Sequence, residues 1–192
     1  GSVGMTGLQG VLESVGTVLS ASAEDKIYGD LSYDVTDAGE VVITGYNGDA
    51  ATVEIPSEID GKPVTSIGWS AFQNCTSLTT ITIPGSVKSV GWSAFKDCTG
   101  LTGITISNGV TIIEGSAFEG CTSLTAIAIP DSVMDIKYNA FKYCTGLKEI
   151  SISNGVTILD MSIFEGCTSL TAIAIPDSVT DIGYNAFKDC IG

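Results

Sequence analysis

The chain lacks two residue types entirely, since its 192 residues include neither histidine nor arginine. Without histidine there is no Ser-His or Cys-His catalytic pair and no imidazole ligand for a metal. Without arginine there is no bidentate phosphate clamp, and the net charge of -14 repels polyanions. No run approaches the roughly 18 apolar residues that a membrane-spanning helix needs. We therefore expect neither nucleic-acid binding nor a membrane span.

One internal repeat contains every cysteine and every phenylalanine of the chain. Each cysteine lies 23 residues after the previous one, and each phenylalanine lies three residues before a cysteine. The six cysteines are Cys75, Cys98, Cys121, Cys144, Cys167 and Cys190; the six phenylalanines are Phe72, Phe95, Phe118, Phe141, Phe164 and Phe187. A fixed period of this length is typical of a solenoid, in which each unit buries its apolar face only against its neighbours.

Each repeat, called a rung below, opens with a short apolar strand. In the first full rung, Ile81 and Ile83 alternate with threonines, which predicts a strand with one buried face. Glycine, serine, asparagine and aspartate then supply a turn, and a second apolar set follows at Val87, Val90 and Phe95. We expect a mostly β fold whose strands stack as a parallel sheet about 4.8 Å apart, with equivalent residues aligned in ladders.

The repeat resembles that of a known family. Leu-x-x-Ile-x-Ile-Pro followed by Ser-Val-x-x-Ile-x-x-x-Ala-Phe-x-x-Cys-Thr is similar to the BspA-like leucine-rich repeat, over residues 51–192. Residues 127–145 fit the pattern throughout, and residues 33–72 resemble the segment that precedes the repeats in this family. The resemblance implies a right-handed solenoid on secreted or surface-attached microbial proteins that bind other macromolecules. It implies no catalytic residues.

Three segments follow along the chain. Residues 1–26 contain apolar residues at helical spacing, which favours a short amphipathic helix; a tag or a signal remnant ending near Ala21-Ser22-Ala23 is the alternative. Residues 27–64 form a capping segment: a β-hairpin over 31–46, turning at 36–39, and a first strand near Val53. Residues 65–192 form the leucine-rich repeat array. The segment 1–60 carries a net charge of -10, which suits a soluble cap.

The last rung has no cap after it in the sequence. Its apolar residues are Ile175, Val179, Ile182 and Phe187, and the chain stops two residues after Cys190. An uncapped end exposes an apolar face and strand edges. We therefore expect either a longer repeat protein, of which this chain is a truncated piece, or an end-to-end homo-oligomer through this rung.

Charged residues alternate in sign along the repeat. One column reads Lys96, Glu119, Lys142, Glu165 and Lys188, and a second reads Glu114, Lys137 and Asp160. If the rungs stack, these columns are expected to place opposite charges side by side. The alternative is that the alternation only reflects recent duplication of two rungs, without selection on charge. The cysteines also form one column, and the parallel side chains of such a column suit buried thiols better than disulfides. The sequence contains no Cys-x-x-Cys motif, which a zinc site would require. We predict no metal site and no cofactor.

Two sets of residues are candidates for partner binding. The first is an aromatic column beside the buried strand residues: Trp69, Trp92, Tyr138 and Tyr184. The second is the outward face of the strands: Thr80, Thr82, Thr105, Glu149 and Ser151. If the aromatic rings face solvent, they can hold a partner's side chains or a sugar ring. The alternative is a packing ladder over the turns beside an idle strand face.

The sequence therefore indicates a non-enzymatic binding module, secreted or at the cell surface. Its expected ligand is an extracellular protein or glycan, and adhesion to a host is the expected role. The alternative is a structural spacer that presents another domain of a longer secreted protein. An enzyme is disfavoured because the sequence shows no catalytic cluster. The recurring acid pair of Asp131 and Asp135, repeated as Asp177 and Asp181, is expected in turn segments rather than across a cleft.

Overall fold

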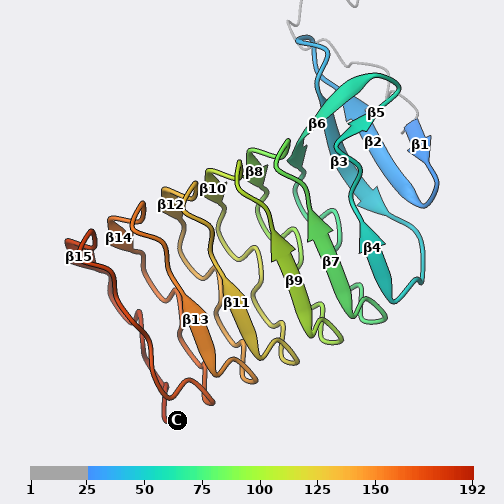
Figure 1. Ribbon diagram of the computed structural model, residues 1–192. Helices are drawn as coiled ribbons and strands as arrows, with labels where there is room; N and C mark the ends of the chain where they lie inside the picture. Colours follow the sequence, from blue (N-terminus) through green and yellow to red (C-terminus); the bar gives the residue numbers. More distant parts are fainter. Residues whose placement is uncertain (1–25) are drawn as a thin grey trace, which may run out of the picture.

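The computed structural model describes residues 26–192, which form a stack of rungs with a β-hairpin at one end (Figure 1). Fifteen strands and no helix lie within this range. The predicted N-terminal helix and the signal-remnant alternative fall in residues 1–25, outside the described residues. The fold is mostly β, as the repeat period predicts.

The hairpin at the N-terminal end is confirmed. Strand β1 (Lys26–Tyr28) pairs antiparallel with β2 (Leu31–Val35), which pairs antiparallel with β3 (Val41–Tyr46). Strand β3 then pairs in parallel with β6 (Lys62–Ile67), which also pairs with the two-residue β5 (Glu58–Ile59). The hairpin thus continues the sheet that the first rung begins, and it covers the end of the array.

The rungs contribute to two rows of parallel strands, although the last rung has only an isolated bridge at Ala174 in the second row. One row follows β6 through the short strands β8 (Ser89–Val90), β10 (Ile112–Ile113), β12 (Asp135–Ile136), β14 (Ile158–Leu159) and β15 (Asp181–Ile182). The other row contains β4 (Thr52–Glu54), β7 (Thr80–Ile83), β9 (Gly103–Ile106), β11 (Ala126–Ala128) and β13 (Glu149–Ser151). Ile81 pairs with Ile104 and Ile127 pairs with Ile150, so the register is one repeat.

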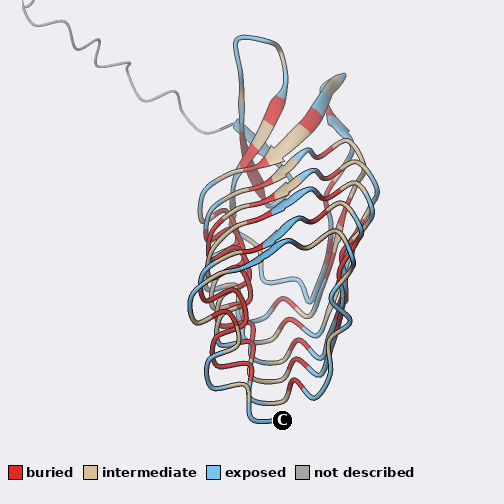
Figure 2. Ribbon diagram, turned by 90° about the vertical axis from the view of Figure 1, so that its left-hand side faces the viewer, coloured by how far each residue is buried: buried red, intermediate tan, exposed pale blue. Residues whose placement is uncertain are grey.

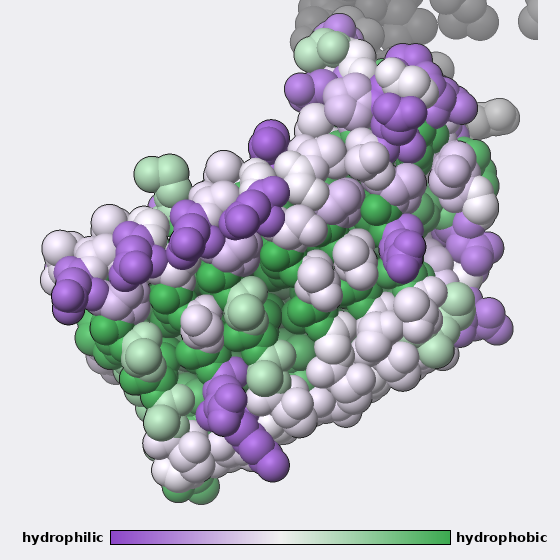
Figure 3. Space-filling model, viewed as in Figure 1, coloured by the Kyte–Doolittle hydropathy of each residue, from purple (hydrophilic) through white to green (hydrophobic). Residues whose placement is uncertain are grey.

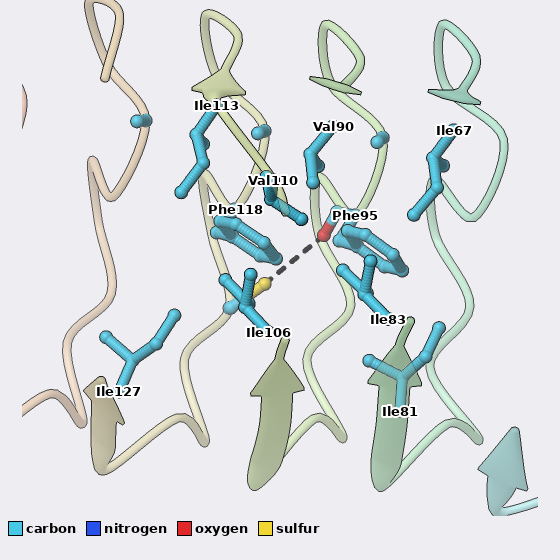
Figure 4. Packing of buried hydrophobic residues seen from close by; sticks show 14 of the residues in the cluster. Ile67, Ile81, Ile83, Val90, Phe95, Ile106, Val110, Ile113, Phe118 and Ile127 are labelled. Carbon is cyan, nitrogen blue, oxygen red and sulfur yellow. Dashed lines mark hydrogen bonds between the residues drawn. The ribbon is translucent and has the colours of Figure 1, made fainter. Parts of the chain in front are cut away.

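The interior is built from ladders of equivalent residues (Figure 4), and Figure 2 shows that the buried segments recur from rung to rung. Phe72 to Phe187 form one continuous stack, with ring centroids 5.0–5.8 Å apart between neighbouring rungs. Tyr46, at the end of the hairpin, stacks on Phe72 with its centroid at 5.3 Å and so closes the ladder. Because each ring contacts the next, the rungs share one core along the stack.

The six cysteines are free thiols, as the column arrangement predicts. From Cys98 onward, each thiol donates a hydrogen bond to the carbonyl of the phenylalanine in the preceding rung, at 2.9–3.2 Å. Figure 4 shows one of these bonds beside Phe95 and Phe118. Burial raises the pKa of Cys121 and of Cys167 to about 12, so these thiols stay protonated at neutral pH.

Two residues in each rung turn the chain through positive φ. The first column contains Ser70, Ser93, Ser116, Asn139, Ser162 and Asn185, with φ of 54–60°. The second contains Asn74, Asp97, Gly120, Tyr143, Gly166 and Asp189, with φ of 58–75°. Backbone bonds then link these turns between rungs, for example from the Ser93 N–H to the Gly115 carbonyl at 3.0 Å. The turn between the two columns is therefore the same rigid unit in each rung.

The first charge column forms ion pairs between rungs, as predicted. Lys96 contacts Glu119 at 3.1 Å, and Glu165 lies between Lys142 at 3.3 Å and Lys188 at 3.2 Å. A hydrogen bond from Ser162 together with these two lysines lowers the pKa of Glu165. The second column behaves differently from the prediction, because Lys137 pairs within its own rung with Asp135 at 3.2 Å.

The apolar residues of the last rung are partly open to solvent. Ile175 is 42% exposed and Ile182 is 54% exposed, whereas the equivalent Ile106 and Ile113 are buried. The predicted end-to-end association through this rung stays a prediction.

Candidate interaction surface

Three neighbouring aromatic side chains on the outer side of the rungs form a continuous group, called the aromatic strip: Trp69 and Trp92, which are exposed, and Tyr138, which is half-buried. Trp69 is 73% exposed and Trp92 is 47% exposed. Their rings stack with centroids 5.9 Å apart and an interplanar angle of 15°, and the edge of Tyr138 packs on Trp92 at 6.2 Å. The two interpretations of this column were a solvent-facing binding surface and a packing ladder. The structure has features of both, because the two tryptophans are exposed and also stack on each other.

The local sequence explains why the rings point outward. Trp69 and Trp92 follow β6 and β8 by two residues, and the last residue of each strand, Ile67 or Val90, is buried. The next buried apolar residues are the Ala-Phe pairs at 71–72 and 94–95, so the tryptophan lies on the outer side of the turn. The αL residue that follows each tryptophan holds the turn in this conformation.

A glycine lets the aromatic strip extend over a rung that has no ring of its own. Gly115 occupies the aromatic column between Trp92 and Tyr138, and a Cβ atom at Gly115 would lie 3.0 Å from the Tyr138 ring. Tyr138 therefore leans across Gly115 to reach Trp92. Tyr184, although 78% exposed, is separated from Tyr138 by the rung of Met161, and the strip does not include it.

The predicted strand face is also present. Strands β7 and β9 place Thr82 beside Thr105, while β11 and β13 place Ala126 beside Glu149 and Ala128 beside Ser151. Thr80, Thr105, Glu149 and Ser151 are exposed, and Thr82 is half-buried. A shallow hollow of about 360 Å³ forms over the alanines, with Glu149 and Ser151 at its side. Figure 3 shows a band of hydrophobic and near-neutral residues on this side, with a row of hydrophilic residues along one edge and a few more on the face itself.

Tyr143 is an exposed aromatic residue that was not predicted as a site residue. Tyr143 is 47% exposed and has φ of 58°, a conformation that costs a bulky residue about 1 kcal/mol or more. The Lys142 ammonium lies 5.0 Å from its ring centroid, and a side chain at Gly166 would clash with the ring. The sequence did contain a signal for this residue, since a tyrosine stands out in a column whose other residues are Asn, Asp and Gly.

The described residues contain no grouping typical of a metal centre. Within residues 26–192, no three or more Cys, Asp or Glu side chains come together in a way that could hold a metal ion. A search of the same residues for a helix of sufficient length and apolarity to span a bilayer finds none. The surfaces that remain are the aromatic strip, the strand face and the pockets near the cap.

Comparison with protein families gives a match over most of the array. Residues 65–192 match the family model described as BspA type leucine rich repeat region, in six copies. No curated protein has a sequence that matches this chain.

Several solved structures share the fold. A leucine rich cell surface protein from Faecalibacterium prausnitzii A2-165 is 31% identical, with a TM-score of 0.77 over 89% of this chain. A T. pallidum leucine rich repeat protein is 30% identical, with a TM-score of 0.69 over 88% of this chain and 90% of its own. The pneumococcal vaccine antigen PcpA, at 23% identity, shares the fold with a TM-score of 0.74 over 86% of this chain and 47% of its own.

The chain spans 53% of the Faecalibacterium protein. The similarity therefore covers the cap and the rungs described above, and it leaves the rest of that relative unmatched.

Proposed function

The chain belongs to the BspA-type leucine-rich repeat family, and we propose that it is an extracellular or cell-surface module that binds a protein or glycan partner. Adhesion to a host surface is the proposed role. The similar Faecalibacterium structure is of a cell surface protein, which supports the proposed location. The observation that carries the proposal is the aromatic strip, which is continuous over four rungs and presents the exposed Trp69 and Trp92 beside the half-buried Tyr138.

The aromatic strip combines large apolar area with little freedom to lose on binding. Backbone bonds run from Ser70 N–H to the Trp92 carbonyl at 2.9 Å and from Ser116 N–H to the Tyr138 carbonyl at 3.0 Å. These bonds fix the spacing of the backbone segments that carry the rings before any ligand arrives, so association costs less ordering entropy. Tryptophan and tyrosine are enriched among the residues that dominate binding energy at protein interfaces.

The strand face offers a second contact area of different chemistry. Its threonines, alanines and serine present small side chains, and the hollow over Ala126 and Ala128 has Glu149 on one side. A flat partner surface could lie along this face with Thr80, Thr105 and Ser151 as hydrogen-bonding groups. We assign it a supporting role because it has no large anchoring side chain.

The test is a binding comparison between matched variants. Extracellular host proteins and an array of glycans are screened with the native chain, and dissociation constants are measured for the ligands retained. The double variant Trp69→Ala/Trp92→Ala is expected to bind at least about tenfold more weakly, as the loss of a central aromatic anchor predicts. Tyr184→Ala is the control, because it removes an exposed aromatic residue of the same column outside the strip.

Equal affinity for the native chain and the double variant would remove the aromatic strip as the site. The alternative function, a structural spacer, is favoured by the continuous phenylalanine ladder, which makes the array a rigid rod. A spacer retains no ligand in the screen. We propose a non-enzymatic function, and hydrolysis of any member of a polysaccharide panel by the purified chain would contradict it.

A further inference from the structure

A pocket of about 430 Å³ lies where the hairpin meets the first strand of the array. The last residue of β1 supplies Tyr28 and the following turn supplies Asp30. The end of β3 supplies Tyr46, and β4 supplies Val53 and Glu54. The pocket is separate from the aromatic strip and from the strand hollow, with which it shares no lining residue.

Oxygen atoms from distant parts of the hairpin converge beside this pocket. A Cβ atom at Gly48 would lie 2.5 Å from the Tyr46 hydroxyl and 2.6 Å from a carboxylate oxygen of Asp30. Both groups therefore occupy the space that a side chain at Gly48 would fill. Tyr46 is held in place, because its ring stacks on Phe72 and its hydroxyl accepts a hydrogen bond from Ala50 N–H at 3.0 Å.

The negative charge of this pocket is not neutralised by the part of the chain that the structure describes. The side chains of Asp30 and Glu54 form no ion pair and no hydrogen bond with residues 26–192. The surrounding segment of residues 26–64 carries eight acidic side chains and two lysines. A field of this sign attracts cations to the pocket.

We propose that this pocket binds an alkylammonium group, the charged end of a lysine side chain on a partner protein. Asp30, Glu54 and the Tyr46 hydroxyl provide oxygen acceptors, which suit the three N–H donors of an ammonium group. The ring of Tyr28 offers an aromatic surface for the cation, and Val53 contacts the aliphatic part of the side chain. Two carboxylates are too few for a calcium site, which takes six to eight oxygen ligands.

The experiment is a titration of the full chain with two peptides, followed by the amide signals of Tyr28 and Val53 in NMR spectra. N-acetyl-Gly-Lys-Gly-amide is the probe, and the same peptide with norleucine replaces the ammonium by a methyl group. The lysine peptide is expected to shift these signals saturably within about 10 mM, the range of millimolar affinity, and the norleucine peptide is expected to leave them in place.

Variants of the chain separate the pocket from the general negative charge of the cap. Asp30→Asn/Glu54→Gln is expected to weaken lysine-peptide binding about tenfold. Asp34→Asn/Glu58→Gln, which removes the same charge from exposed positions outside the pocket, is expected to change it by less than about twofold. Gly48→Ala displaces Asp30 and Tyr46 without a change of charge, and is expected to weaken binding as well.

Three outcomes overturn the proposal: no saturable shift with the lysine peptide, equal shifts with norleucine, or equal weakening by the two charge variants. Trp69→Ala/Trp92→Ala is expected to bind the lysine peptide normally, because neither tryptophan lines the pocket. Failure of the lysine site is thereby distinguishable from failure of the aromatic strip.

Discussion

The inner and outer columns of the same rungs differ sharply in how far they repeat. The inner columns contain phenylalanine in all six rungs and cysteine in all six, and these residues form unbroken ladders. The outer aromatic column instead reads Trp69, Trp92, Gly115, Tyr138, Met161 and Tyr184. A ladder works only if each member matches the ones above and below it, whereas an exposed column has no such requirement. Departures from the repeat therefore mark where a specific surface is built.

The largest expected effect comes from breaking an inner column. Phe118→Ala removes a fully buried ring that stacks on Phe95 and Phe141, and it should lower the free energy of unfolding by about 3–5 kcal/mol. Urea unfolding followed by circular dichroism measures the change. The matched outer substitution is Trp69→Ala, with an expected loss below about 1 kcal/mol because its side chain is mostly exposed. Similar losses for the two variants would contradict the difference between inner and outer columns.

The next effect concerns the buried thiols and alkaline pH. An unfolded chain ionises its thiols above about pH 9, while the folded Cys121, with a pKa near 12, stays protonated. Its contribution to stability is thus complete below pH 9 and is lost as pH rises toward 12. The expected slope is about 1.4 kcal/mol per pH unit for each buried thiol. Urea unfolding at pH 9–11 in a reducing buffer measures it.

Cys121→Ala tests which thiols cause the alkaline loss. This variant should reduce the slope by the share of one thiol. Cys75→Ala should not reduce it, because the hydrogen bond with Cys98 lowers the pKa of Cys75 in the fold. An unchanged slope in Cys121→Ala would assign the alkaline loss to other groups.

The smallest of the three effects concerns the charge column. Glu165→Gln removes a carboxylate that contacts Lys142 and Lys188, with an expected loss of about 1 kcal/mol at neutral pH. The pKa of Glu165 is lowered in the fold, so its contribution is present above pH 4.5 and is lost as pH falls through the folded pKa. The two proteins should therefore reach equal stability in acid, by urea unfolding. Glu119→Gln, which breaks the single contact with Lys96, should cost less.

The periodicity of the sequence predicted most of the fold because the repeat itself encodes the packing. The repeat period determined the register of β7 with β9, and the column of cysteines predicted free thiols correctly. The hairpin over 31–46 followed from its alternating pattern and its turn residues. These features depend on neighbours along the chain or one period away, which a single sequence displays.

Contacts that do not follow the period were not predictable from it. The pocket of Asp30, Tyr46 and Glu54 depends on how the hairpin packs beside β4, and no residue spacing in the sequence indicates that packing. Lys137 forms its ion pair with Asp135 in its own rung, a contact that its position in the charge column does not indicate. The exposure of Trp69 and Trp92 could not be predicted either. Membership of a column indicates on which side of the rung a residue lies, but not how deeply its side chain is buried.

The alternating charge column also restricts how such an array can change in length. The segments 96–141 and 142–187 correspond closely, so two rungs form the unit of charge alternation. Addition or loss of two rungs keeps lysine beside glutamate at each junction, where Lys142 now meets Glu165. Addition or loss of a single rung brings lysine beside lysine or glutamate beside glutamate at one junction, which is destabilising. The charge column therefore favours gain or loss of rungs in even numbers. An even number keeps opposite charges adjacent at every junction, whereas an odd number introduces repulsion between like charges.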